Sequence, residues 1–243
     1  MALRRIHGAA ARLKPAGIAL LALLAAACAG LPDYARPRMH PGDPQQPAYT
    51  GFTYRTLTPA DFRASSPPDH LGGHAERVNA HSAIRIRPTP ASKFVVSQGE
   101  LYGQPYFFGR IERIAFEAVM IPERSWWNPA MPPAATAYVL QHEQIHFALS
   151  EIDARRLTRE AAAWAAEELV IRPNPQEVHA EIVRLVTERV NAAMEAGLKR
   201  HAEFDEDTSL FYNPRRQRWW SWTVEDELRE TQPAGAQGET AAP

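Results

Sequence analysis

Two histidines and a glutamate lie within one short stretch of this 243-residue chain, which reads His142, Glu143, Gln144, Ile145, His146. Residues four positions apart share one face of a helix, so both imidazoles can reach the same zinc ion. The glutamate between them can take a proton from a zinc-bound water as it attacks a carbonyl, and later pass a proton to the leaving nitrogen. This HExxH spacing predicts a zinc site and peptide-bond hydrolysis with Glu143 as the general base.

The alternative is that both histidines are ordinary members of a helix face and are satisfied by hydrogen bonds. His142 and Ile145 belong to the apolar face of the expected helix, where a histidine without a metal would need a buried partner. We therefore favour metal binding. Because the chain has a single cysteine, His and carboxylate side chains must hold any metal.

A catalytic zinc normally has three protein ligands, so a third must be found. On the same helix Glu151 faces nearly the opposite side, and Asp153 lies about 10 Å along the axis from His146. Neither is a good ligand. If the chain returns as an antiparallel helix after the prolines near residue 173, residues at equal sequence distances on either side of that position lie side by side. Residues 200 to 204 would then lie beside the histidines.

That part of the sequence contains the densest cluster of potential ligands in the chain: His201, Glu203, Asp205, Glu206 and Asp207. The alternative for the acidic residues is a solvated helix end.

The spacing of apolar residues in the elements that must position these residues changes once along the chain, from the period of strands to that of helices. Apolar residues alternate between about residues 50 and 122, as Ile84 and Ile86 do, which predicts strands. We hypothesise that a strand over residues 114–120 has a free edge that pairs with an extended peptide substrate.

After Pro132 the spacing becomes helical, and a helix is expected from Ala134 to about Val170. Prolines end it, and a second helix is expected from about Gln176 to His201. Its apolar stripe consists of Val178, Ile182, Val186, Val190 and Met194. Strands followed by two long helices indicate the α+β fold class.

The two ends of the chain are predicted to lie outside the folded domain of residues 50–230. Residues 1–27 have a basic start and a short apolar run, as in an export signal. The residues before Cys28 are similar to the lipobox of bacterial lipoproteins, which predicts lipidation there; the alternative is plain cleavage. Residues 28–49 are expected to form a proline-rich tether, and residues 231–243 a disordered tail.

The charge balance excludes one broad class of partner. With 27 basic and 28 acidic residues, the chain does not suit binding to nucleic acid through phosphate neutralisation. The expected partners are a peptide or protein substrate in the cell envelope, and the membrane through a lipid on Cys28. The protein is expected to be exported and to face the periplasm or the cell exterior.

Three stretches in the same order resemble the bacterial family numbered 922 among the domains of unknown function, whose members are described as predicted secreted zinc-dependent proteases. The stretches are Thr56–Arg63, then His142–Phe147 with Glu151 and Ala154–Arg155, then Phe204–Thr208 followed by Gln217 and Trp219. The resemblance spans most of the expected domain. It implies an HExxH metallopeptidase, and we predict a zincin-like fold in which N-terminal antiparallel strands precede the HExxH helix and a second, antiparallel helix.

The chain departs from that family pattern near the expected third ligand. Relatives tend to have a His-Gly pair where this chain has Leu210 and Phe211, and leucine cannot bind a metal. Either Asp205 takes the place of the third ligand or the protein is catalytically weakened. We predict that His142, His146 and Asp205 bind zinc, with His201 in reserve. The alternative functions are a catalytically silent zinc-dependent lipoprotein that acts as a binding module, and a structural lipoprotein whose motif is fortuitous.

Overall fold

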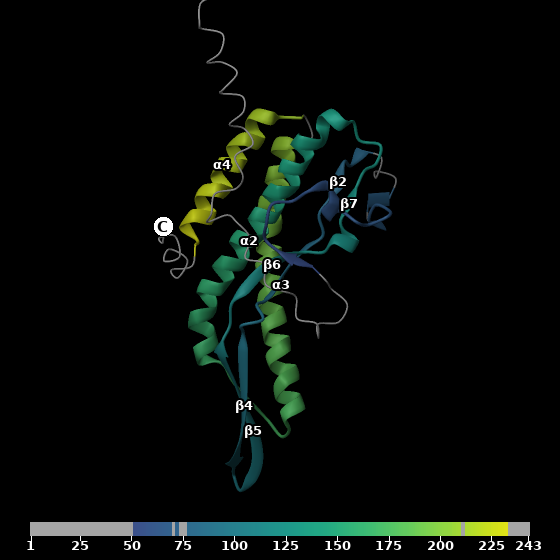
Figure 1. Cartoon of the computed structure of the whole chain (residues 1–243). Coiled ribbons are helices and arrows are strands. Elements are labelled where there is room, and N and C mark those ends of the chain that lie inside the picture. Colours follow the sequence, from purple (N-terminus) through teal and green to yellow (C-terminus); the bar gives the residue numbers. More distant parts are fainter. Residues whose placement is uncertain (1–50, 70, 73–76, 210–211, 233–243) are drawn as a thin grey trace, which may run out of the picture. The chain divides into compact units, whose positions relative to one another are not determined.

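The computed structural model describes residues 51–69, 71–72, 77–209 and 212–232 (Figure 1). The expected export signal, the tether with Cys28, Leu210 and nearly all of the expected tail lie outside these residues. Among the residues described, no helix is long and apolar enough to cross a membrane.

The described chain has the predicted α+β composition, with antiparallel sheets and long helices. Its strands are β1 (Phe52–Thr53), β2 (Ala80–His81), β3 (Ile84–Pro88), β4 (Lys93–Leu101), β5 (Gln104–Arg113), β6 (Phe116–Met120), β7 (Trp126–Trp127) and β8 (Leu169–Arg172). Its α-helices are α2 (Thr136–Glu167), α3 (Pro175–Thr208) and α4 (Pro214–Glu230), which pack against one another (Figure 1).

The sheet beside the long helices has the strand order β1-β6-β3, and all five residues of β6 are buried. On the side of β6 away from β3, the N–H groups of Phe116 and Ala118 donate to Thr158 Oγ1 and Glu151 Oε2 of α2, at 2.7 and 3.2 Å. The predicted free edge over residues 114–120 is therefore wrong, because β6 is the central strand. The edge strands of this sheet are β3 and the two-residue β1.

A second sheet has the order β4-β5-β8, and its β4–β5 hairpin extends away from the other strands (Figure 1). Tyr102 and Gly103 turn the chain with φ angles of 55° and 75°, the left-handed region that a tight hairpin turn requires. Gly109 of β5 lets α3 approach closely, because a Cβ there would lie 2.2 Å from a methyl group of Val178.

Helix α2 is shorter than the expected span from Ala134 to Val170. Pro133–Ala135 form a 3-10 turn before it, and β8 follows its last residue. Val170 and Ile171 of β8 pair with Gly109 and Phe108 of β5. These β-branched residues thus continue a sheet instead of the helix.

Helix α3 is longer than expected, since it continues past His201 to Thr208 and so carries Asp205. Asn174 caps its start by accepting a hydrogen bond from the N–H of Glu177 at 2.8 Å. The expected stripe is buried from Val178 to Val190, whereas Met194 at its end is 38% exposed.

Helix α4 was not predicted. Asn213 caps it and Pro214 is its first residue, and the helix covers α2 and α3 with four buried side chains, Gln217, Trp220, Val224 and Leu228. Thr231, expected to begin the disordered tail, is instead buried at the end of α4, where its hydroxyl donates to the carbonyl of Glu227.

Candidate metal centre

Helices α2 and α3 bring the three predicted ligands together. Asp205 Oδ1 lies 3.1 Å from His142 Nε2 and 3.0 Å from His146 Nε2, and the two Nε2 atoms lie 3.1 Å apart. Ligand atoms on one tetrahedral zinc ion, each roughly 2.0–2.1 Å from the metal, would be about 3.3 Å apart. The cluster could therefore hold a metal ion, and its two nitrogens and one oxygen suit zinc.

The electrostatics of the cluster keep Asp205 ionised. Partial burial alone would raise the pKa of this carboxyl, but hydrogen bonds from His142 and His146 and their charge outweigh it and hold the pKa well below its usual range. Burial alone would lower the pKa of His146, yet Asp205 and Glu143 together raise it. A cation in place of these protons would satisfy the same carboxylate.

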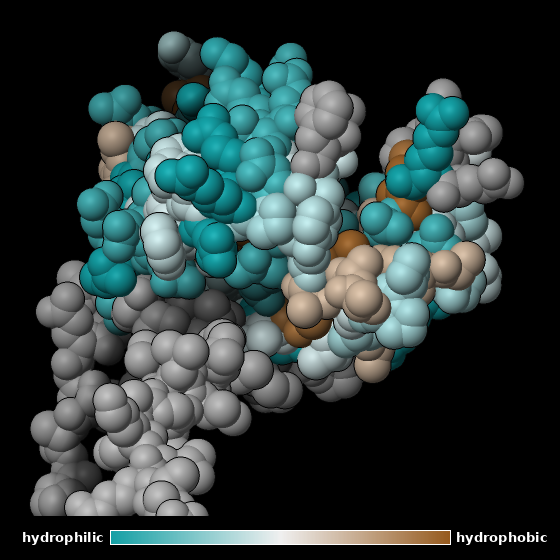
Figure 2. Space-filling view, turned by 90° about the horizontal axis from the view of Figure 1, so that it is seen from above, coloured by the Kyte–Doolittle hydropathy of each residue, from teal (hydrophilic) through white to brown (hydrophobic). Residues whose placement is uncertain are grey.

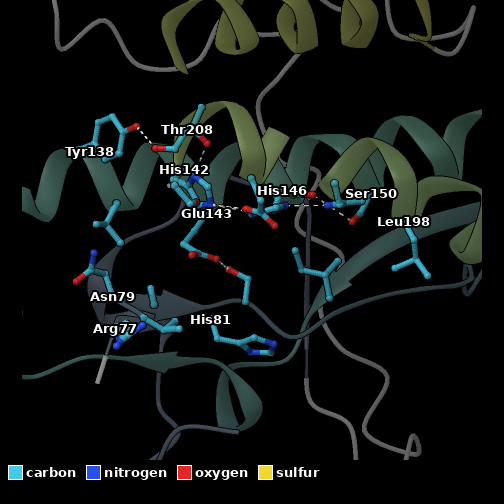
Figure 3. Close-up of a pocket in the computed structure, with 18 of the residues that line it drawn as sticks. Arg77, Asn79, His81, Tyr138, His142, Glu143, His146, Ser150, Leu198 and Thr208 are labelled. Atoms are coloured by element: carbon cyan, nitrogen blue, oxygen red, sulfur yellow. Dashed lines mark hydrogen bonds and ion pairs between the residues drawn. The ribbon is translucent and has the colours of Figure 1, made fainter. Parts of the chain in front are cut away.

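The outer nitrogen of each histidine ring also has a partner. The Thr208 hydroxyl donates to the carbonyl of Phe204, so at 3.3 Å it accepts from His142 Nδ1–H (Figure 3). His146 Nδ1 lies 2.8 Å from Nδ1 of His201. With these partners at Nδ1, loss of the Nε2 protons would leave the Nε2 lone pairs of both rings directed at the cluster.

His201, the reserve ligand, is therefore not brought into the cluster. Its ring is nearly parallel to that of His146, at an interplanar angle of 7°, and the two rings meet at their Nδ1 atoms, on the side away from Asp205. Burial, followed by the charge of His146, lowers the pKa of His201 to about 4. A neutral His201 can accept the hydrogen bond from His146 and so fix the orientation of that ring.

An aromatic support beneath the histidines was not predicted. Phe204 is fully buried and stacks on His142 with centroids 4.4 Å apart, while its edge meets His146 at 4.9 Å. Trp220 of α4 packs on the same ring at 5.4 Å. The unpredicted helix therefore helps to hold the site.

Glu143 is only 5% exposed and lies in the wall of the same cavity as the cluster. Its Oε2 accepts a hydrogen bond from the hydroxyl of Ser82, which lies between β2 and β3 (Figure 3). Sequence reasoning did not find Ser82, since only the folded chain brings it to α2.

The cavity has a volume of about 630 Å³ and lies between the segment 77–86 and helices α2 and α3. A cavity of this size is typical of a ligand site. In the view from above, hydrophobic residues lie along the margin of a hollow, on the other side of which the surface is mainly hydrophilic (Figure 2).

The two acidic residues of α2 that were judged poor ligands lie outside the cluster. Arg155 Nε donates to Glu151 at 2.7 Å, and this carboxylate anchors β6. Asp153 forms an ion pair with Arg156 at 3.5 Å and lies close to Gly197 of α3. Glu151 therefore joins α2 to β6, and Asp153 lies where α2 packs against α3.

Comparisons of the chain with protein families, with curated proteins and with solved structures find no match in any of the three. The chemistry of the site therefore has to be argued from its own residues.

Proposed function

We propose that the protein is an exported zinc metallopeptidase with a zincin-like fold. The observation that carries this proposal is the convergence of His142, His146 and Asp205 beside the buried carboxylate of Glu143 in one cavity. These three residues would hold the ion. When bound, zinc supplies a Lewis acid that polarises a carbonyl and lowers the pKa of water towards neutrality.

Glu143 is the proposed general base. The Ser82 hydroxyl holds one oxygen of its carboxylate, and Glu143 lines the cavity, so the second oxygen is the one proposed to act there. That second oxygen accepts a proton from the attacking water and later delivers a proton to the leaving amine. Thr208 and His201 act only through the histidine rings, so their proposed role is to position His142 and His146.

The proposed location is the cell envelope, with the chain anchored to the membrane by a lipid on Cys28. The nearly balanced charge of the chain supports a polypeptide substrate in preference to nucleic acid.

The direct test replaces Glu143 by Ala and measures both bound zinc and hydrolysis of casein, an unfolded protein substrate. Zinc should be retained, because Glu143 is not a ligand, and hydrolysis should fall by about 100-fold or more. The matched control is Glu160→Ala, an exposed glutamate on the same helix, which should leave both measurements unchanged.

Persistent hydrolysis in Glu143→Ala would remove the assigned role of this residue. The second candidate is a catalytically silent zinc-binding lipoprotein, which the leucine at position 210 favours. It predicts zinc binding by the parent protein without hydrolysis, and a function in cells that survives Glu143→Ala.

A further inference from the structure

The cavity at the metal cluster continues into a second one. This second cavity has a volume of about 560 Å³ and lies between β3 and α3. The two cavities share Arg85, Ile86 and Met194, so they adjoin and form one groove. The lining of the second cavity is mainly apolar and includes Phe94, Val119, Ile121, Val183 and Val190.

One face of α3 follows this groove from the second cavity to the metal cluster. The groove-lining residues on this face recur at steps of three and four: Val183, Thr187, Val190, Met194, Leu198, His201 and Asp205. Between the first and last of these residues the helix rises by about 33 Å. A bound chain with one end at Asp205 can therefore reach Val183.

Three apolar side chains on this face are left uncovered by the described residues, whereas Val190 is buried. Val183 is 45% exposed, Met194 is 38% exposed and Leu198 is 64% exposed. Their neighbours Ile182 and Val186 are buried in the core, with exposures of 1% and 5%. The exposed apolar residues thus mark the groove.

The opposite wall of the groove offers backbone groups that no described strand pairs with. Ile121 donates its N–H to the carbonyl of Ala83, and this bond sets the alternation of the β3–β6 ladder. Ile84 and Ile86 therefore direct their N–H and C=O groups away from β6, where no described strand pairs with them. Such an edge is complementary to the backbone of an extended polypeptide.

Building on the proposed function, we infer that the groove binds an extended polypeptide along the β3 edge, with an apolar side chain in the second cavity. That side chain lies several residues from the scissile bond and contacts Val183 and Met194. The second cavity thus selects substrates by an apolar residue at a distance from the metal cluster.

The test uses the full-length, zinc-loaded Glu143→Ala protein, so that binding is measured without hydrolysis. The probes are fluorescein-labelled ten-residue peptides of alternating threonine and alanine in which a single leucine or glutamine occupies each position in turn. Their extended length of about 33 Å matches the groove. Fluorescence anisotropy should show about tenfold tighter binding for leucine than for glutamine at one or two positions.

Val183→Glu places a charge in the second cavity and should abolish that preference. The matched control is Leu169→Glu, since Leu169 is 44% exposed but lies outside both cavities. The control should retain the preference. No preference for leucine in the parent protein, or equal effects of both variants, would overturn the inference.

Two further outcomes separate this inference from the proposed function. If peptide binding depends on Val183 but the parent protein hydrolyses no substrate, the inference of a peptide-binding groove stands and the proposed peptidase function is rejected. Dimerisation that Val183→Glu abolishes, with no peptide binding, would show that a second copy of the chain covers the cavity and would overturn the inference.

Discussion

At the level of single residues, the site depends on two histidine rings, those of His142 and His146, whose Nδ1 atoms already have hydrogen-bond partners. Thr208 receives His142 Nδ1–H, and His201 faces Nδ1 of His146 at 2.8 Å. Both partners lie on α3, as Asp205 does. A change that displaces Thr208 or His201 should weaken metal binding without removing any predicted ligand.

His201→Phe should lower zinc affinity by about 10- to 100-fold, because the phenyl ring still fills the space beside His146 but cannot accept its hydrogen bond. His201→Gln, which keeps an acceptor, should lose less. Competition for zinc with a fluorescent chelator measures both affinities. Equal affinities in the parent and His201→Phe would show that His201 does not position the ligand.

Sequence reasoning predicted the cluster because helical spacing placed His142 beside His146, and counting outward from the proline break led to the neighbourhood of Asp205. It could not find Phe204 as a support or Ser82 as a partner of Glu143. The contact of Ser82 with α2 joins residues 61 positions apart. Nothing local in the sequence marks such a contact.

At the level of elements, α2 and α3 were predicted from the sequence, but their exact ends and helix α4 were not. Helix α2 stops three residues earlier than expected, because Val170 continues a sheet that only the folded chain assembles. The sequence did carry a signal for α4. Asn213 followed by Pro214 is a typical helix start, and Gln217, Trp220 and Val224 recur at helical steps.

The packing of the β4–β5 hairpin on α3 should depend on Gly109. A Cβ there would lie 2.2 Å from Val178 and 2.9 Å from Ile182, so Gly109→Ala should destabilise the fold by about 1–3 kcal/mol. Urea unfolding measures this cost.

Gly99→Ala is the matched control on the same hairpin. Its nearest neighbour is the ring edge of the half-buried Phe108, which can rotate away, so the cost should be smaller. Equal stability of Gly109→Ala and the parent protein would contradict the close packing of the hairpin against α3.

At the level of the whole molecule, the segment 55–61 is bound to α2, the helix that carries two of the three predicted ligands. Gln144, inside the HExxH stretch, accepts from the N–H of Leu57 at 2.7 Å and donates to the carbonyl of Arg55 at 3.2 Å. Arg55 in turn pairs with the buried Asp61. The site helix and the start of the domain should therefore unfold together.

The ion pair between Arg55 and Asp61 makes the contribution of this connection to stability depend on pH. Burial alone would raise the pKa of Asp61, but hydrogen bonds from Arg55 and Thr58 lower it below its ordinary value of 3.8. A carboxyl with a lowered pKa in the folded state stabilises the protein above the unfolded-state pKa, and this contribution is lost as the pH falls through the folded-state pKa.

The parent protein should therefore be more stable than Asp61→Asn at pH 7 by about 1–3 kcal/mol. The difference should shrink as the pH falls below about 4. Urea unfolding of both proteins across this range measures it. A difference that stays constant down to acidic pH would show that the charge of Asp61 contributes nothing.

The most direct test of the central claim is the metal content of the untagged protein, measured by elemental mass spectrometry beside His142→Ala and Asp205→Ala. The convergence of three ligand atoms from α2 and α3 predicts close to one zinc ion per chain, lost from both variants. Zinc that persists in Asp205→Ala would contradict the assigned third ligand. If the parent protein binds no zinc even when the metal is supplied, the proposed function as a zinc metallopeptidase is contradicted.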